Sequence, residues 1–201
     1  MDQYYQELYT PIAYHWLGNL SHAKKGKSSK SICFCKNQYH GIVSFFADNI
    51  IDLRVENSEQ ESVFYLHFQI KNLKMLLENI KTFFDFLNKG EETHVNRIND
   101  IEMAKNLNIL FTCSTGLTTS YYAYLLENYF KEQHLNVNVS AVGYRDLDAI
   151  QQHYDYIFVA PQISYQYVSL HEKYGDKVFL IDTYGFATGN IHSIIDIIQN
   201  K

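Results

Sequence analysis

From Asn108 onward, apolar and polar positions alternate in the way that a layered α/β domain requires. The short apolar runs "NILFTC", "NVNVSAVG", "YIFVAP" and "KVFLID" are rich in Ile, Val and Phe, as are parallel strands covered on both faces. The segments between and after them, such as "TTSYYAYLLENYFKEQH" and "GNIHSIIDIIQN", carry apolar residues at helical spacing. The pattern predicts a four-stranded parallel sheet with helices on both faces. The loops after Cys113, Gly143, Pro161 and Asp182 then gather at one edge of the sheet.

The first half of the chain predicts a small α+β domain. "DQYYQELYTPIAYHWLGNLS" indicates a helix that is interrupted or begins near Pro11, and "IIDLRVENSEQESVFYLHFQI" indicates two strands around a polar turn. "NLKMLLENIKTFFDFLNKG" is an amphipathic helix ended by Gly90, and "EETHVNRIND" is a polar linker. We therefore expect an α+β domain of unknown role over residues 1–100 and a second domain over residues 106–201.

Composition narrows the classes of function. The 201 residues carry a formal net charge of -5, and the basic run "HAKKGKSSK" also holds Gly and Ser, which favours a solvated linker over a nucleic-acid contact. The start "MDQYYQELYTPIAYHWLGNL" lacks a charged segment followed by an apolar one, and no apolar run approaches the roughly 20 residues of a membrane span. These features predict a soluble, cytoplasmic protein that neither binds nucleic acid nor inserts into a membrane.

Three cysteines at uneven positions do not form a disulfide framework, so reduced thiols are expected. In "SICFCKNQYH", Cys33 and Cys35 lie on one face of a predicted strand near His40, but no second pair stands at a zinc-like spacing. We interpret both as buried structural thiols and expect neither a metal nor a cofactor. His15, His40 and His67 lie among aromatic and aliphatic residues, which favours packing or surface roles.

The stretch "CSTGLTTS", Cys113 to Ser120, lies between a predicted strand and a predicted helix. N–H groups at a helix start lack intrahelical partners and, with the helix dipole, favour an anion. Gly116 lets the backbone fold closely around such a group, and the same environment favours a thiolate at Cys113, which we expect to be the most reactive thiol. The predicted phosphate-binding residues are Ser114, Thr115, Gly116, Leu117, Thr118, Thr119 and Ser120.

One position separates two phosphate chemistries that use such a loop. A cysteine phosphatase with the pattern C-x5-R carries an arginine six residues after its nucleophile, whereas this chain has Thr119 there. The absence of arginine favours a phosphocysteine that lasts long enough to be passed on. The loop also lacks the G-x-x-x-x-G-K pattern of a nucleotide-binding P-loop.

Three motifs in order resemble a known family. They are "ILFTCSTGLTTS", "YDYIFVAPQISY" and "VFLIDTYGFATGN", and together they cover roughly residues 106–201. The segment is similar to the lactose/cellobiose-type enzyme IIB components of the bacterial phosphoenolpyruvate-dependent sugar phosphotransferase system. The resemblance implies that Cys113 accepts phosphate from a histidine of a IIA protein and passes it to a sugar bound in a membrane IIC permease. It also implies that the Pro161-Gln162 turn forms a neighbouring wall.

The N-terminal half has no counterpart in a single-domain IIB component, and the helix start "YYAYLL" is bulkier than usual for the family. Two other functions therefore stand beside the phosphocarrier. One is a regulatory protein that uses a IIB-like domain, and the other is an interaction protein without a covalent step, in which Cys113 merely closes a strand. The sequence names neither the sugar nor the oligomeric state.

Overall fold

The computed structural model describes residues 8–28, 30–90, 106–114 and 116–200. The chain divides into two compact units, Met1–Thr93 and His94–Lys201. The predicted linker "EETHVNRIND" lies outside the described residues.

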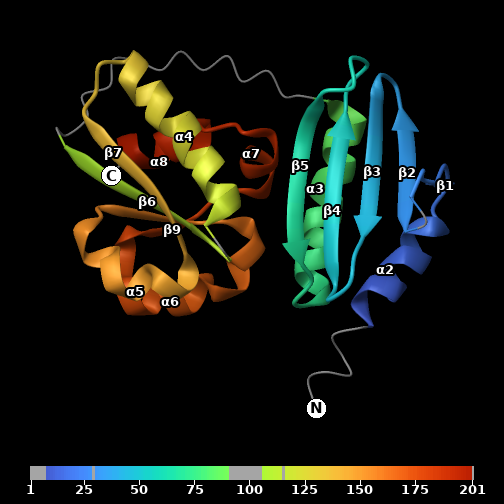
Figure 1. Cartoon of the computed structure of the whole chain (residues 1–201), viewed down its shortest axis with the longest axis horizontal. Coiled ribbons are helices and arrows are strands. Elements are labelled where there is room, and N and C mark those ends of the chain that lie inside the picture. Colours follow the sequence, from blue (N-terminus) through green and yellow to red (C-terminus); the bar gives the residue numbers. More distant parts are fainter. Residues whose placement is uncertain (1–7, 29, 91–105, 115, 201) are drawn as a thin grey trace. The chain divides into compact units, whose positions relative to one another are not determined.

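The N-terminal unit is built on an antiparallel sheet with the strand order β1-β2-β3-β4-β5 (Figure 1). Its elements are α2 (Tyr9–Gly18), β1 (Lys24–Lys25), β2 (Ser31–Lys36), β3 (Tyr39–Phe45), β4 (Ile50–Glu56), β5 (Ser62–Gln69) and α3 (Leu73–Lys89). The predicted N-terminal helix begins at Tyr9, so that Pro11 falls in its first turn, where proline is tolerated. The strand β3 was not among the predicted elements.

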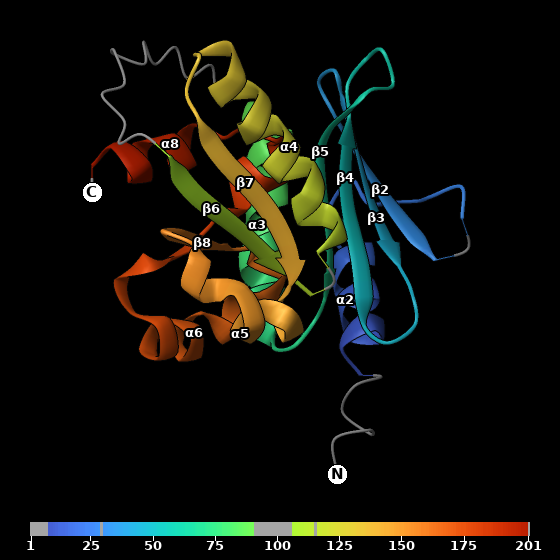
Figure 2. The same ribbon diagram turned by 60° about the vertical axis from the view of Figure 1, so that its left-hand side comes forward.

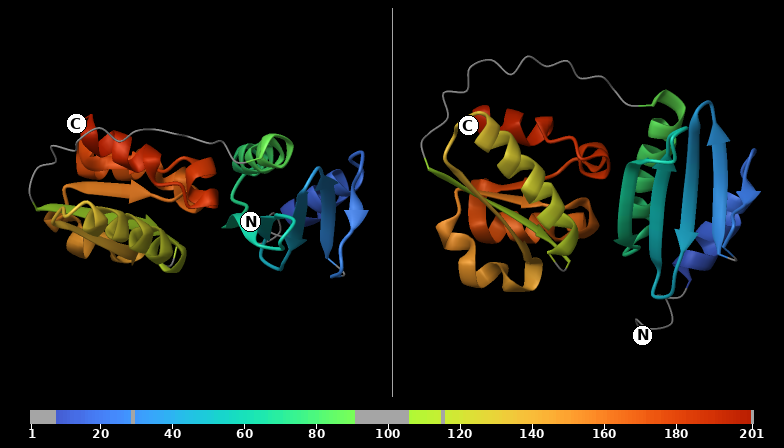
Figure 3. Two further views of the ribbon diagram at one scale, coloured as in Figure 1. Left: turned by 90° about the horizontal axis from the view of Figure 1, so that it is seen from above. Right: turned by 45° about the horizontal axis from the view of Figure 1, so that its top comes forward.

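One face of this sheet forms the core with α3 (Figure 3). Alternate residues along β4 and β5, such as Leu53 and Leu66, are buried, while the residues between them face outward. Asn72 caps the start of α3 by accepting from the Met75 N–H at 2.9 Å, and the helix ends at Gly90 as predicted.

The opposite face of the sheet is open and polar. Cys33 and Cys35 do share one face of β2, as predicted, but it is this open face. Cys35 is exposed and Cys33 only half-buried, so the interpretation of both as buried structural thiols is wrong. On the same face, His40 lies by Glu56 and His67 forms a short contact with Asp52.

The C-terminal unit contains the predicted four-stranded parallel sheet, in the order β7-β6-β8-β9. Its strands are β6 (Leu107–Cys113), β7 (Val137–Gly143), β8 (Tyr156–Val159) and β9 (Val178–Leu180). Its helices are α4 (Leu117–Glu132), α5 (Leu147–Ile150), α6 (Tyr167–Tyr174), α7 (Thr183–Thr188) and α8 (His192–Gln199), with 3-10 turns at Tyr144–Asp146, Gln151–His153, Pro161–Gln166 and Gly175–Lys177.

Helices cover both faces of this sheet, which confirms the predicted fold class. On one face the Phe111 ring packs against Tyr122 of α4, which in turn stacks on Phe186 of α7. On the other face Leu110 of β6 packs in a cluster with Leu147 of α5 and, from α6, Leu170. Figure 2 shows α4 lying along β6 and β7.

Among the described residues, no helix combines the length and the apolar character needed to cross a bilayer.

Candidate functional site

The candidate site lies at the carboxyl end of β6, where the strand passes into α4. Cys113 is the last residue of β6 and pairs in register with Gly143, the last residue of β7. Side chains alternate along a strand, so Cys113 lies on the same face as Phe111, the face that carries α4. The first turn of α4 therefore lies next to the Cys113 sulfur.

Gly116 is the N-cap of α4, and its conformation fixes the turn. Its φ of 86° and ψ of -17° lie in the left-handed region that favours glycine. A Cβ at this position would lie 3.0 Å from the Gly143 nitrogen and 3.1 Å from the Val142 carbonyl carbon. Both neighbours are backbone atoms, so the loop folds this closely onto the end of β7 only because residue 116 has no side chain.

Two donors converge on the cysteine sulfur. The Gly116 N–H donates to Cys113 Sγ at 3.0 Å, and the Thr119 hydroxyl lies 3.3 Å from the same sulfur. Thr119 Oγ1 is also 3.0 Å from the Gly116 carbonyl oxygen, so its single proton is directed to one of the two acceptors at a time. Thr119 is fully buried, and it occupies the position at which a C-x5-R phosphatase carries arginine.

The start of α4 supplies further donors to the site. The N–H groups of Leu117, Thr118 and Thr119 lie in the first turn, where no intrahelical carbonyl can accept from them. The loop Cys113–Ser120 contains no charged side chain, so the groups that it offers to an anion are backbone dipoles and hydroxyl groups.

The remaining predicted residues occupy different positions around the sulfur. Ser114 is exposed, Thr118 is half-buried, and the exposed Ser120 donates its hydroxyl to the Gly116 carbonyl at 2.8 Å. Thr115 and the side chain of Leu117 lie outside the described residues.

The predicted wall, Pro161 and Gln162, opens the 3-10 turn that follows β8 and is buried. The turn starts beside the site strand, because the Ala160 N–H donates to the Thr112 carbonyl at 2.9 Å. Within the described residues, Gln162 Oε1 is buried without a hydrogen-bond partner. The contact of this turn with the loop stays a prediction.

The three thiols differ in burial. Cys113 is 1% exposed, whereas Cys35 is exposed. Burial, followed by the nearby Cys35 and Glu56, raises the pKa of the Cys33 thiol. From these exposures we predict that a bulky reagent modifies Cys35 before Cys113, whereas the loop position of Cys113 predicts that Cys113 is the most reactive thiol.

Sequence reasoning missed a second polar network in the same unit. Asp182 caps α7 by accepting from the Gly185 N–H at 2.6 Å, and Ser193 donates to its other oxygen at 2.6 Å. The buried Tyr122 hydroxyl donates to the Asn190 carbonyl, and burial, then Asp182, raises the pKa of this phenol. The available signal for this cap was Asp182 itself, a preferred N-cap residue that stands directly after a predicted strand.

Residues 108–196 match the family model described as "PTS system, Lactose/Cellobiose specific IIB subunit". The C-terminal unit carries a IIB-like domain. This domain is therefore similar to a phosphotransfer component of the sugar phosphotransferase system. It spans somewhat less than half of the chain, and the N-terminal unit lies outside it.

Two solved structures are similar to the IIB-like domain. The solution structure of a cellobiose-specific phosphotransferase IIB component from Borrelia burgdorferi is 26% identical, with 47% of this chain and 90% of that chain covered and a TM-score of 0.41. The lactose-specific IIB component domain from Streptococcus pneumoniae is 18% identical, with 47% and 98% covered and a TM-score of 0.41. No curated protein matches the chain.

Proposed function

We propose that the IIB-like domain is a phosphocarrier, in which Cys113 takes a phosphoryl group from a phosphohistidine of a IIA protein. The cysteine sulfur attacks phosphorus, the S–P bond forms as the N–P bond breaks, and the thiol proton ends on the released imidazole nitrogen. The observation that carries this proposal is the convergence of the Gly116 N–H and the Thr119 hydroxyl on Cys113 Sγ.

The N–H groups at the start of α4 and the Thr119 hydroxyl would also stabilise a phosphate on Cys113. A phosphate on Cys113 adds roughly -1.5 to -2 charge at the start of a helix, where free N–H groups and the dipole stabilise an anion. Because Cys113 is 1% exposed, the residues over the sulfur have to move before a phosphohistidine reaches it. In the second step, the hydroxyl of a sugar held by a IIC permease attacks phosphorus, the O–P bond forms as the S–P bond breaks, and the hydroxyl proton ends on the Cys113 sulfur.

The first transfer is tested by incubating the full chain with the general phosphotransferase proteins, a lactose/cellobiose-type IIA and labelled phosphoenolpyruvate. We expect stoichiometric label on the wild type and on Cys35→Ser, which removes the exposed thiol. Cys113→Ser is expected to lose it, because an alcohol is far less ionised than a thiol at neutral pH. Equal labelling of Cys113→Ser would refute the proposal.

A regulatory protein is the second candidate, and the separate N-terminal unit outside the family match favours it. In that case the phosphate on Cys113 alters an association and is not delivered to a sugar. Adding membranes that contain a IIC permease, with lactose or cellobiose, separates the two. Loss of label from the protein with formation of sugar phosphate supports the carrier, whereas retained label supports the regulator.

A further inference from the structure

Two exposed tyrosines lie on the helix that follows the candidate nucleophile. Tyr121 and Tyr124 of α4 are 65% and 58% exposed, and they stand three residues apart, so their side chains are neighbours on the outer face of the helix. On the inner face of α4, Tyr122 and Leu126 are buried. Neither exposed ring therefore belongs to the packing that holds α4 on the sheet.

Both tyrosines lie close to the point where a phosphoryl donor has to approach Cys113. The Thr119 hydroxyl is 3.3 Å from the sulfur, and a helix rise of about 1.5 Å per residue places Tyr121 and Tyr124 roughly 3 and 8 Å beyond Thr119 along the axis. A typical protein interface covers about 800 Å² on each partner, which is a disc roughly 16 Å in radius. Both tyrosines fall within such a disc centred on Cys113, even across the helix diameter of about 10–12 Å.

Helix geometry also directs Tyr121 toward this point. Side chains in a helix lean toward its N-terminus, so that a residue covers the turn before its own Cα atom. Tyr121 therefore leans over the first turn of α4, whose backbone N–H groups would hold the phosphate. Directly after Cys113, Ser114 is exposed. A protein that brings a phosphohistidine to the sulfur thus contacts this end of α4.

The surface around the two tyrosines is uncharged. Residues 117–126 carry no charged side chain, and the first charged residue of α4, Glu127, is paired with Lys131 at 2.9 Å. Protein interfaces are enriched in tyrosine and depleted of charge at their centres, because the ring buries a large apolar area while its hydroxyl group can keep a hydrogen bond. The partner that fits is a protein with an uncharged, apolar surface around its phosphohistidine.

We propose that Tyr121 and Tyr124 anchor the phosphohistidine protein that donates to Cys113. The docking surface serves the proposed phosphocarrier function, on which this inference rests. At about 100° per residue, both side chains lie on the side of α4 opposite to Thr119, so they take part in docking and not in the transfer itself. Their loss should weaken binding of the donor and leave the rate of transfer within the bound complex unchanged.

Binding is measured first, without any transfer. Isothermal titration calorimetry gives the affinity of the full chain for an unphosphorylated lactose/cellobiose-type IIA protein. We expect the double variant Tyr121→Ala, Tyr124→Ala to bind roughly tenfold more weakly or worse, and Tyr121→Phe, Tyr124→Phe to bind like the wild type because the rings remain. Alanine favours helix and both positions are exposed, so the variants should fold, which circular dichroism checks.

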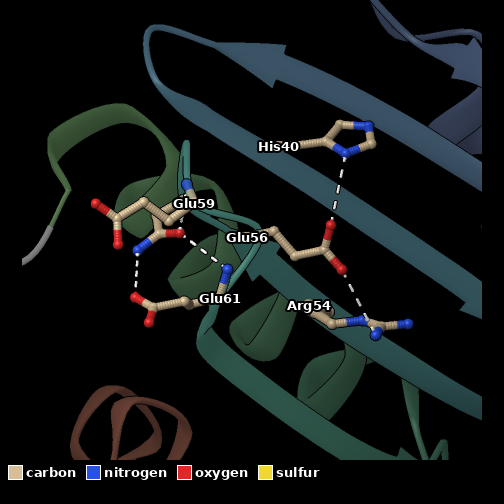
Figure 4. Close-up of polar contacts among 6 residues, drawn as sticks. His40, Arg54, Glu56, Glu59 and Glu61 are labelled. Carbon is tan, nitrogen blue, oxygen red and sulfur yellow. Dashed lines mark hydrogen bonds and ion pairs between the residues drawn. The ribbon is translucent and has the colours of Figure 1, made fainter.

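Tyr65→Ala is the matched control for the loss of an exposed ring. Tyr65 lies on the open face of the N-terminal sheet, is 41% exposed and stands opposite Arg54 of β4. The charges beside it are balanced locally, because Arg54 lies 3.6 Å from Glu56, which lies 3.9 Å from His40 (Figure 4). This variant should bind the IIA protein with wild-type affinity.

Transfer from the phosphorylated IIA protein then separates docking from chemistry. In the double alanine variant, the donor concentration that gives half the maximal rate should rise roughly tenfold, while the single-turnover rate at saturating donor stays at the wild-type value. Three results would overturn the docking surface: no binding of the IIA protein by the wild type, wild-type affinity in the double alanine variant, or an equal loss in Tyr65→Ala. A wild type that binds through these tyrosines but accepts no phosphate would support the docking surface and refute the phosphocarrier.

Discussion

Substitution of Gly116 by alanine tests the close approach of the loop to β7. A left-handed conformation costs a non-glycine residue about 1–2 kcal/mol. The new Cβ would also lie 3.0 Å from the Gly143 nitrogen, and a backbone neighbour cannot turn aside as a flexible side chain can. Overpacking typically adds about 1–3 kcal/mol. We expect a destabilisation of the C-terminal unit of about 2–5 kcal/mol, or roughly 10–40 °C in its melting temperature.

Gly189→Ala is the matched control. Gly189 also lies in the left-handed region, with φ 74° and ψ 15°, but an added Cβ there would meet only the flexible side-chain end of Leu125, at 3.3 Å. This variant should lose only about 1–2 kcal/mol, or roughly 4–16 °C. Melting followed by far-UV circular dichroism reports on the whole chain, and the fluorescence of Trp16, the only tryptophan, reports on the N-terminal unit. Equal shifts for the two variants, or a shift of the Trp16 transition by Gly116→Ala, would refute the reasoning.

Three further predictions concern single groups. Thr119→Val removes a hydroxyl 3.3 Å from Cys113 Sγ and should slow phosphate acceptance roughly tenfold relative to Thr118→Val; equal rates would contradict the role of the hydroxyl. The raised pKa of Tyr122 means that the folded state keeps this phenol protonated. The contribution of Tyr122 to the free energy of unfolding should therefore be intact below pH 10.0, the pKa of an unperturbed tyrosine, and should be lost as pH rises above that value. Thermal melts at alkaline pH should show this loss in the wild type and not in Tyr122→Phe. In native protein a maleimide should modify Cys35 before Cys113, because Cys35 is exposed and Cys113 is buried. Mass spectrometry of samples taken at successive times measures the order. Faster modification of Cys113 would contradict its burial.

The sequence predicted the C-terminal sheet because its strands are short apolar runs that periodicity distinguishes from helices. It did not predict α7, which is six residues long and lies in a stretch read as a loop. That helix depends on the Asp182 cap and on the stacking of Phe186 on Tyr122, and the second contact joins residues far apart in the chain. A short helix fixed by distant contacts leaves little periodic signal.

Residue alternation placed Cys33 and Cys35 on one face of a strand but did not reveal which face is covered. That depends on α3, which follows much later in the chain and packs on the opposite side. In the same way, the loop composition predicted donors around Cys113, whereas the contact of Gly116 with Gly143 arises from the pairing of β6 with β7. Local pattern predicts elements, and long-range packing decides which of their faces meet.

The site of phosphorylation is the central claim, and mass spectrometry tests it most directly. The full chain is phosphorylated through a IIA protein, digested under conditions that preserve S–P and N–P bonds, and fragmented to locate the phosphate. We predict a single added phosphate on Cys113, absent from Cys113→Ser. A phosphate on a histidine or on any other residue of the wild type, with Cys113 unmodified, would contradict the account.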